Sequence, residues 1–239
     1  MIIVISPSKT YQTERQAPLQ IEKPYYDQEA NDLRQQLKAW SREDFQQRMK
    51  LSDALTDQVA ELYHGKTPGE GNTAITYYTG LVYKQLCLSL YDEAEWAYIK
   101  DHVRILSAMY GLLKPQDGIM PYRLDFLVRW PELNLYKYWK DAMSHAWGNR
   151  TIIDLSSKEF GKMLPDNRIQ IQFLQRNKKG EWKAQSTKTK MARGKMLNWM
   201  IQEQIQKPEE IRAFDLEGYR FDEQRSSEAV WFFIQVDQN

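Results

Sequence analysis

The architecture is set by the segment Ile2-Ile3-Val4-Ile5-Ser6-Pro7-Ser8-Lys9-Thr10. Four consecutive β-branched residues predict a strand that is buried on both faces, as in the centre of a parallel sheet. Pro7 ends the strand because proline has no amide hydrogen for the ladder. Loops after such strands are common ligand sites in α/β folds. The Ser6 and Ser8 hydroxyls and the Lys9 amine are therefore candidates to hold a phosphate, although the glycines of a Walker P-loop are missing.

Strand and helix patterns alternate along the rest of the chain. Further strands are predicted at 74–78, 151–155, 169–173, 182–186 and 230–236. Helices are predicted at 31–40, 52–63, 82–90, 93–102, 136–147 and 195–205, and Ser41 with Asp44 forms a capping box for one more. No linker or repeat divides the sequence. We therefore expect one mixed α/β domain over residues 1–239, with a mixed central sheet flanked by helices.

The composition excludes several classes of protein. Of the 239 residues, 42% are hydrophobic and 13% aromatic, which excludes a disordered chain, and 11 glycines with 9 prolines exclude a collagen-like one. The single cysteine, Cys87, excludes an internal disulfide framework and fits a reducing compartment. The apolar start lacks a signal-peptide pattern, and no apolar stretch approaches the roughly 18 residues of a membrane span. We expect a soluble, cytoplasmic protein with no membrane partner.

Charge is distributed unevenly, although the net charge is only +1. Residues 150–195 contain 12 basic and 4 acidic residues, whereas residues 203–239 contain 4 basic and 9 acidic ones. The basic segment is either a solvated, lysine-rich hairpin or a surface for phosphate polyanions. The run Lys188 to Lys195 is predicted to precede or open a helix at 195–205. Cations at a helix N-terminus are unfavourable unless an anion binds there, which favours a phosphate ligand.

Two more segments carry candidate phosphate contacts. The stretch Arg104 to Pro115 contains a bend at Gly111, and its pattern favours a core strand and turn over a tight hairpin that presents backbone N–H groups to phosphate oxygens. Farther along, Arg123 lies two residues before Asp125. The two side chains form an ion pair, or the guanidinium faces a phosphate.

Metal-binding patterns are missing from the sequence. None of His64, His102 and His145 has a second histidine or a cysteine at ligand spacing, and Glu93 and Glu95 fall on opposite faces of a helix. We therefore expect no metal site and no cofactor.

Several segments in order resemble the YaaA family of bacterial peroxide stress resistance proteins, from about residue 1 to residue 236. The resemblance is carried by Ile5-Ser6-Pro7-Ser8-Lys9-Thr10, Tyr78-Thr79-Gly80-Leu81-Val82-Tyr83, Arg104-Ile105-Leu106-Ser107-Ala108-Met109-Tyr110-Gly111, Leu113-Lys114-Pro115, Pro121-Tyr122-Arg123-Leu124, Leu135-Tyr136-Lys137-Tyr138-Trp139, Asp154-Leu155-Ser156-Ser157, Ala192-Arg193-Gly194, Phe214-Asp215 and Gly218-Tyr219-Arg220-Phe221-Asp222.

The resemblance implies a cytosolic protein that protects against hydrogen peroxide and is linked to a smaller pool of unincorporated iron. It also implies a mixed α/β fold of its own and binding of duplex DNA through a helix-hairpin-helix-like element and a positively charged cleft. The hairpin would be Ser107 to Gly111. The cleft cations would include Lys9, Arg104, Lys114, Arg123, Lys190 and Arg193. The chain departs from the family pattern at Ala108, where glycine is common, and at Leu81, where aspartate is usual.

Two functions are therefore predicted. The first is a DNA-binding stress protein with weak sequence specificity, which contacts DNA through Lys9, Arg104, Gly111, Lys114, Arg123, Lys188, Lys190, Arg193 and Lys195. The alternative is an enzyme that acts on a nucleotide or nucleic acid, with a pocket formed by Ser6, Ser8, Lys9, Arg123 and Asp125. The alternative requires these five residues to converge in space. Direct iron handling is disfavoured because clustered ligands are missing.

Overall fold

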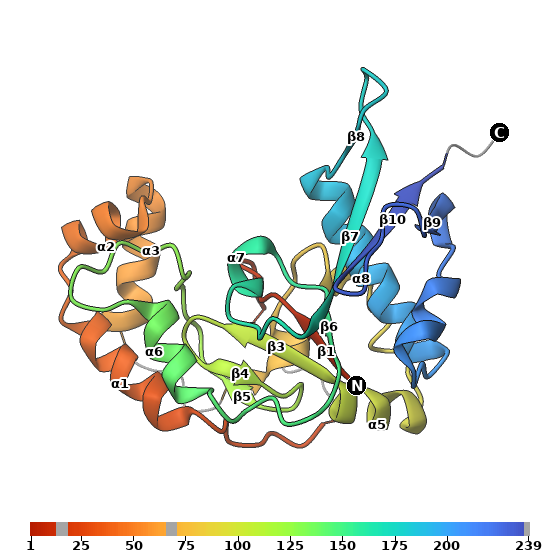
Figure 1. The fold of residues 1–239 in the computed structure, drawn as a ribbon. Coiled ribbons are helices and arrows are strands. Elements are labelled where there is room, and N and C mark those ends of the chain that lie inside the picture. The colour runs from red at the N-terminus through yellow and green to blue at the C-terminus, as the bar shows by residue number, and fades with distance from the viewer. Residues whose placement is uncertain (13–18, 66–70, 237–239) are drawn as a thin grey trace.

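A mostly parallel sheet runs through the molecule (Figure 1). The structure is a computed structural model that describes residues 1–12, 19–65 and 71–236. Within these ranges eight strands form one sheet, in which seven follow the order β4-β3-β1-β6-β7-β10-β9 and β8 pairs with β7. The parallel strands are β1 (Ile2–Ile5), β3 (Val103–Ser107), β6 (Ile152–Asp154), β7 (Arg168–Arg176) and β10 (Val230–Gln235).

Antiparallel strands complete the main sheet, and two more form a small separate sheet. β4 (Gly111–Leu113) pairs with β3, β9 (Tyr219–Asp222) with β10, and β8 (Trp182–Lys183) with β7. The small sheet pairs β2 (Asn72–Thr73) with β5 (Gly118–Ile119). Figure 1 shows β7 and β8 projecting from the body as a long hairpin.

Helices pack at both ends of the sheet and over it. Figure 1 shows α1 (Asp27–Lys38), α2 (Arg42–Met49), α3 (Asp53–His64) and α6 (Leu135–Ala142) grouped beyond the β4 end. α5 (Glu93–His102) packs on β1 and β3, and α8 (Ser186–Gln202) packs on β7 and on α5. Short helical segments are α4 (Ala74–Tyr77), α7 (Lys158–Gly161), η1 (Tyr83–Gln85), η2 (Pro208–Ala213) and η3 (Leu216–Gly218). The predicted mixed α/β architecture is confirmed.

The β1 strand lies in the middle of this sheet, as its composition predicts. All four of its residues are buried, and Val4 pairs with Arg104 of β3 on one side and Asp154 of β6 on the other. Because β1 and β6 are parallel neighbours, the residues that follow them emerge at the same edge. This edge carries the candidate site.

Three predicted elements are wrong. Of the predicted strand at 74–78, residues 74–77 form the short helix α4 and only Tyr78 is extended, because the Thr76 hydroxyl bonds to Asn72 Oδ1 (3.0 Å) and Thr73 Oγ1 (2.7 Å) and closes a helical turn. The predicted helix at 82–90 shrinks to η1, and beyond it the Cys87 N–H donates to Asn198 Oδ1 of α8 (3.1 Å). α8 begins at Ser186, nine residues before the predicted start at residue 195.

Candidate phosphate-binding cavity

A cavity of about 520 Å³ lies outside the carboxyl ends of β1 and β6. In open α/β sheets this is the usual position of a ligand site. Its walls come from four parts of the chain: residues 6–10 after β1, residues 80–83 around η1, residues 122–125, and residues 155–160 after β6. α8 adds Lys190 and Arg193.

The loop after β1 is held in place by its neighbours. The Ser6 hydroxyl accepts a hydrogen bond from the Ser157 N–H (2.8 Å), and the Ser6 carbonyl accepts one from the Tyr83 hydroxyl (2.9 Å). Ser8 Oγ accepts a bond from the Thr10 N–H (3.1 Å), which closes a tight local turn. Any side chain on Gly80 would overlap with the Ser8 hydroxyl, so glycine allows residues 80–83 to approach this loop closely.

One part of the cavity wall contains the Lys9 amine and the carboxyl groups of Asp125 and Glu159. Lys9 Nζ lies 2.6 Å from Asp125 Oδ2, and both groups are partly exposed. Glu159 Oε1 accepts a hydrogen bond from the Phe126 N–H (2.9 Å). Burial, and then the nearby Asp125 carboxylate, raise the pKa of Glu159. The Glu159 carboxyl group therefore holds a proton more readily than an exposed glutamate does.

α8 supplies the second group of cations because it lies very close to η1. A side chain on Gly194 would overlap with the Val82 carbonyl, so only glycine allows this approach. Lys190 and Arg193 lie three residues apart on the helix, and both line the cavity.

Arg193 is the most unusual of these cations. Its Nε–H is buried and has no hydrogen-bond partner among the described residues. Burial lowers the pKa of the Arg193 guanidinium, and the Asp154 carboxylate partly offsets this effect. That carboxylate is already occupied, because it accepts bonds from Arg168 Nε (3.0 Å), the Ser156 N–H (2.8 Å) and the Ser156 hydroxyl (2.6 Å). In the part of the chain that the structure describes, no carboxylate forms an ion pair with Arg193.

Arg123 is anchored through its backbone, which leaves its guanidinium for the cavity. The Tyr63 hydroxyl donates to the Arg123 carbonyl (2.9 Å) and accepts from the Arg123 N–H (3.3 Å). Next to it, the buried Tyr122 hydroxyl bonds to Tyr78 (2.7 Å) and Ser107 (2.8 Å). Within the described residues, no carboxylate forms an ion pair with Arg123 or with Lys190.

All five residues of the predicted enzyme pocket line this one cavity: Ser6, Ser8, Lys9, Arg123 and Asp125. The convergence that the enzyme alternative requires is met. Asp125 pairs with Lys9 and not with Arg123, so the first of the two alternatives for Arg123, an ion pair with Asp125, is not formed.

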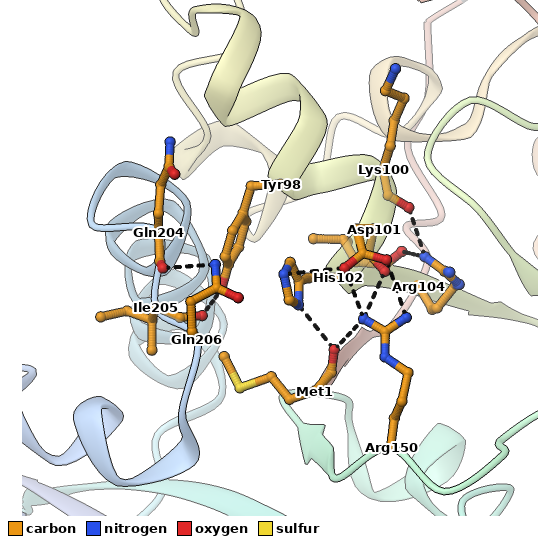
Figure 2. Close-up of polar contacts among 11 residues, drawn as sticks. Met1, Tyr98, Lys100, Asp101, His102, Arg104, Arg150, Gln204, Ile205 and Gln206 are labelled. Carbon is orange, nitrogen blue, oxygen red and sulfur yellow. Dashed lines mark hydrogen bonds and ion pairs between the residues drawn. The ribbon is translucent and has the colours of Figure 1, made fainter.

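Of the predicted DNA contacts, Lys9, Arg123, Lys190 and Arg193 line the cavity, whereas Arg104 does not. Arg104 is the second residue of β3 and pairs with Val4 of β1. Its guanidinium lies near Arg150, which bonds to the Met1 carbonyl before the start of β1, and therefore points away from Ser6. Its guanidinium donates to the carbonyls of Lys100 (3.0 Å) and Val103 (2.7 Å), beside the ion pair of Asp101 with Arg150 (Figure 2). Sequence spacing alone gave no sign of this separation.

The turn from Ser107 to Gly111 is a core element, as the local pattern favoured. It joins two strands, β3 and β4, and not two helices, so the expected helix-hairpin-helix-like element is not found at this position. The N–H groups of Met109 and Tyr110 donate to Ser107 Oγ inside the core (3.1 Å each). Gly111 is also buried, and these groups are not presented to a ligand. Ala108 is fully buried, and its carbonyl accepts a bond from Trp139 Nε1 (2.8 Å).

The remaining predicted contacts lie outside the cavity. Lys114 lies at the start of a turn. Its N–H donates to Asp117 Oδ2 (2.8 Å), which closes the turn. Lys195 forms an ion pair with Glu217, and Lys188 is exposed with its amine 3.5 Å from Gln235 Oε1. Because α8 starts at Ser186, Lys190 to Lys195 lie within the helix and do not crowd its N-terminus. The argument from an unfavourable helix start is therefore wrong for them.

Sequence reasoning missed several wall residues, chiefly Ser157, Glu159, Tyr83 and Tyr122. Ser157 and Glu159 could have been found from the predicted strand at 151–155. When this strand pairs in parallel with the strand at 2–5, the residues that follow it lie beside Ser6. Leu81, where the family pattern has aspartate, also lines the cavity. The cavity of this chain is apolar at that position.

The described residues contain neither a cluster of metal ligands nor a membrane-spanning helix. Among those residues, no group of three or more His, Cys, Asp or Glu side chains is placed to hold a metal ion. None of the helices there is both long enough and apolar enough to span a bilayer.

Comparison with known proteins places the chain in a family. The family model described as "Peroxide stress protein YaaA" matches residues 1–225. A "UPF0246 protein" of Finegoldia magna is 31% identical over 242 residues, covering 98% of both chains. A "UPF0246 protein" of Agathobacter rectalis is 31% identical over 250 residues with the same coverage. The chain belongs to the peroxide stress protein YaaA family.

Proposed function

We propose that this peroxide stress family member acts by binding duplex DNA, with little sequence specificity, through phosphate groups held at the cavity. The observation that carries the proposal is the convergence of Arg123, Lys190 and Arg193 on one cavity without ion-pair partners among the described residues. Unpaired cations that lie close together repel each other, and a buried one also loses hydration. A phosphate anion relieves both costs.

Measurement of duplex binding tests the proposal. The anisotropy of a labelled duplex is followed as protein is added, over a series of salt concentrations, for the wild type and for Lys190→Glu and Arg193→Gln. We expect each variant to weaken binding about tenfold at low salt, because each removes a phosphate contact.

Lys188→Glu is the matched control. Lys188 lies on α8 two residues from Lys190, is exposed, and does not line the cavity, so the same change in net charge is made outside the site. Equal effects of Lys188→Glu and Lys190→Glu would show that only the overall charge matters. Absence of binding by the wild type at low salt would overturn the proposal.

The link to iron is proposed to be indirect. The cavity wall offers two carboxylates, Asp125 and Glu159, and no histidine. Iron sites normally use a larger cluster of His or carboxylate ligands. Anaerobic titration of the full chain with Fe²⁺ is expected to show no tight, stoichiometric binding, and such binding would contradict this view.

A second candidate function is enzymatic, and the convergence of Ser6, Ser8, Lys9, Arg123 and Asp125 favours it. Asp125 and Glu159 would serve as acid and base, while the cations stabilise charge that develops on a phosphate. Incubation with nucleotides and short oligonucleotides, followed by chromatography of the products, tests this function. The enzymatic function would be established if the wild type converts one of these substrates and Asp125→Asn still binds it but no longer converts it.

A further inference from the structure

The cavity is larger than a single phosphate group requires. Its volume of about 520 Å³ falls in the range of pockets that enclose small organic ligands. Apolar side chains of Leu81, Val82, Leu155 and Phe160 form part of the wall. The cations therefore share the cavity with an apolar surface that a phosphate ion alone would leave uncovered.

The position of Arg193 requires a ligand that enters the cavity. Lys190 is exposed and can reach a phosphate on the outside of a duplex, but Arg193 is only partly accessible and its Nε–H is buried. Phosphates of an intact duplex lie on a broad, convex surface. Such a surface covers a cavity without filling it.

The number of unpaired cations also constrains the ligand. Arg123, Lys190 and Arg193 bring three positive charges to one cavity, whereas Asp125 neutralises the Lys9 amine and Glu159 is the only other carboxyl group among the described wall residues. A phosphodiester within a strand carries one negative charge, whereas a phosphate monoester carries about −1.5 to −2 near pH 7. The monoester matches the cavity better.

The geometry points to a nucleoside that bears a terminal phosphate monoester as the ligand of this cavity, supplied by a DNA end or by a free mononucleotide. The phosphate binds Arg123, Lys190 and Arg193, and the base packs on Leu81, Val82 and Phe160. This inference rests on the proposed phosphate binding at the same site. It makes strand ends, and not the side of the duplex, the preferred form of DNA.

Paired ligands test the inference. Two duplexes of identical sequence are compared by anisotropy, one with 5′-phosphate and one with 5′-hydroxyl ends. Deoxynucleoside 5′-monophosphates, the matching deoxynucleosides and inorganic phosphate are compared by titration calorimetry. We expect the phosphorylated duplex to bind about tenfold more tightly and the monophosphate to bind more tightly than either of its parts, since charge-assisted bonds and apolar contact both contribute.

Variants place the binding in the cavity. Arg193→Gln removes the partly buried cation, and Val82→Trp fills the cavity without changing any charge. Both are expected to weaken monophosphate binding about tenfold or more. Leu90→Trp, at a side chain that is 80% exposed and outside the cavity, is the matched control for the added bulk. Melting temperatures show that each variant is folded.

The outcomes separate the two proposals. Salt-dependent duplex binding without any preference for phosphorylated ends, and without monophosphate binding, overturns the inference and leaves the proposed function standing. Monophosphate binding without duplex binding overturns the proposed function and supports the cavity ligand. Inorganic phosphate binding as tightly as the monophosphate overturns the role of the apolar wall. Equal monophosphate binding by Val82→Trp and the wild type also overturns it.

Discussion

Gly111 begins β4 with a φ of +66°, and a Cβ there would lie 2.5 Å from Trp139 Cζ3. We expect Gly111→Ala to lower the free energy of unfolding by about 2–4 kcal/mol, because the added methyl is both strained and overpacked. Gly148→Ala is the control, since Gly148 has a φ of +55° but nothing within 4 Å of a Cβ. It should cost only about 1 kcal/mol. Urea unfolding measures both, and equal losses would show that packing against Trp139 contributes nothing.

Asp117 is 2% exposed, and its burial raises the pKa of the carboxyl group to about 6. The folded state therefore holds its proton more tightly than the unfolded state, whose pKa is about 3.8. This contribution to stability is complete at a pH below 3.8 and is lost as the pH rises through 6.

The Asp117→Asn variant keeps an oxygen that accepts the Lys114 N–H and does not titrate. Relative to this variant, the wild type should lose about 2–3 kcal/mol of unfolding free energy between pH 4 and pH 7.5. Urea denaturation at several pH values provides the comparison. A difference between the two proteins that does not change with pH would contradict the shifted pKa.

Residues at strand ends were predictable from the sequence, but their partners were not. Ser6, Ser8 and Lys9 were found because they directly follow a strand whose composition places it in the centre of the sheet. Arg104 was misplaced because the sequence does not give the direction of its side chain, whose guanidinium donates to the carbonyls of Lys100 and Val103 and so lies away from the cavity. Glu159 was missed because only the pairing of β1 with β6 brings it to the cavity.

At the scale of elements, local signals were reliable where the side chains act on their own backbone. The capping box of Ser41 and Asp44 is present, with Ser41 Oγ accepting the Asp44 N–H (3.1 Å) and Asp44 accepting the Ser41 N–H (3.0 Å). The predicted helix at 82–90 failed because Asn198, a residue more than a hundred positions away, takes the Cys87 N–H. The early start of α8 was missed because residues 186–190 are all polar, so no apolar period marks the first turn.

The contact between α8 and η1 predicts a link between packing and ligand binding. Gly194→Ala forces the helix away from the Val82 carbonyl, which displaces Lys190 and Arg193 relative to the rest of the cavity. We expect a loss of about 1–3 kcal/mol in unfolding free energy, and weaker duplex binding in the same variant. Thr187→Ala, at an exposed position of the same helix, should change neither. Unchanged binding by a folded Gly194→Ala protein would show that this contact does not position the cations.

At the scale of the whole molecule, four cations converge at one edge of the sheet although the net charge is only +1. The charge is therefore local, and the number of phosphates neutralised should be small. Asp125 neutralises Lys9, so if Arg123, Lys190 and Arg193 each neutralise one phosphate, the logarithm of the binding constant should fall against the logarithm of salt with a slope of about −3. Anisotropy titrations from low to moderate salt give this slope. A value near zero would contradict an electrostatic mode, and a much steeper one would show that cations outside the cavity take part.

The position of β1 has a consequence for biosynthesis. This strand is made well before its two neighbours in the sheet, which are residues 103–107 and 152–154. At ribosomal speeds of about 5–20 residues per second, the first 150 residues take roughly 10–30 s to emerge. During that interval β1 can pair at most with β3, so the edge that β6 covers in the folded protein stays unpaired and exposed to aggregation. The nascent chain should therefore depend on chaperones that bind short apolar segments until β6 has left the exit tunnel.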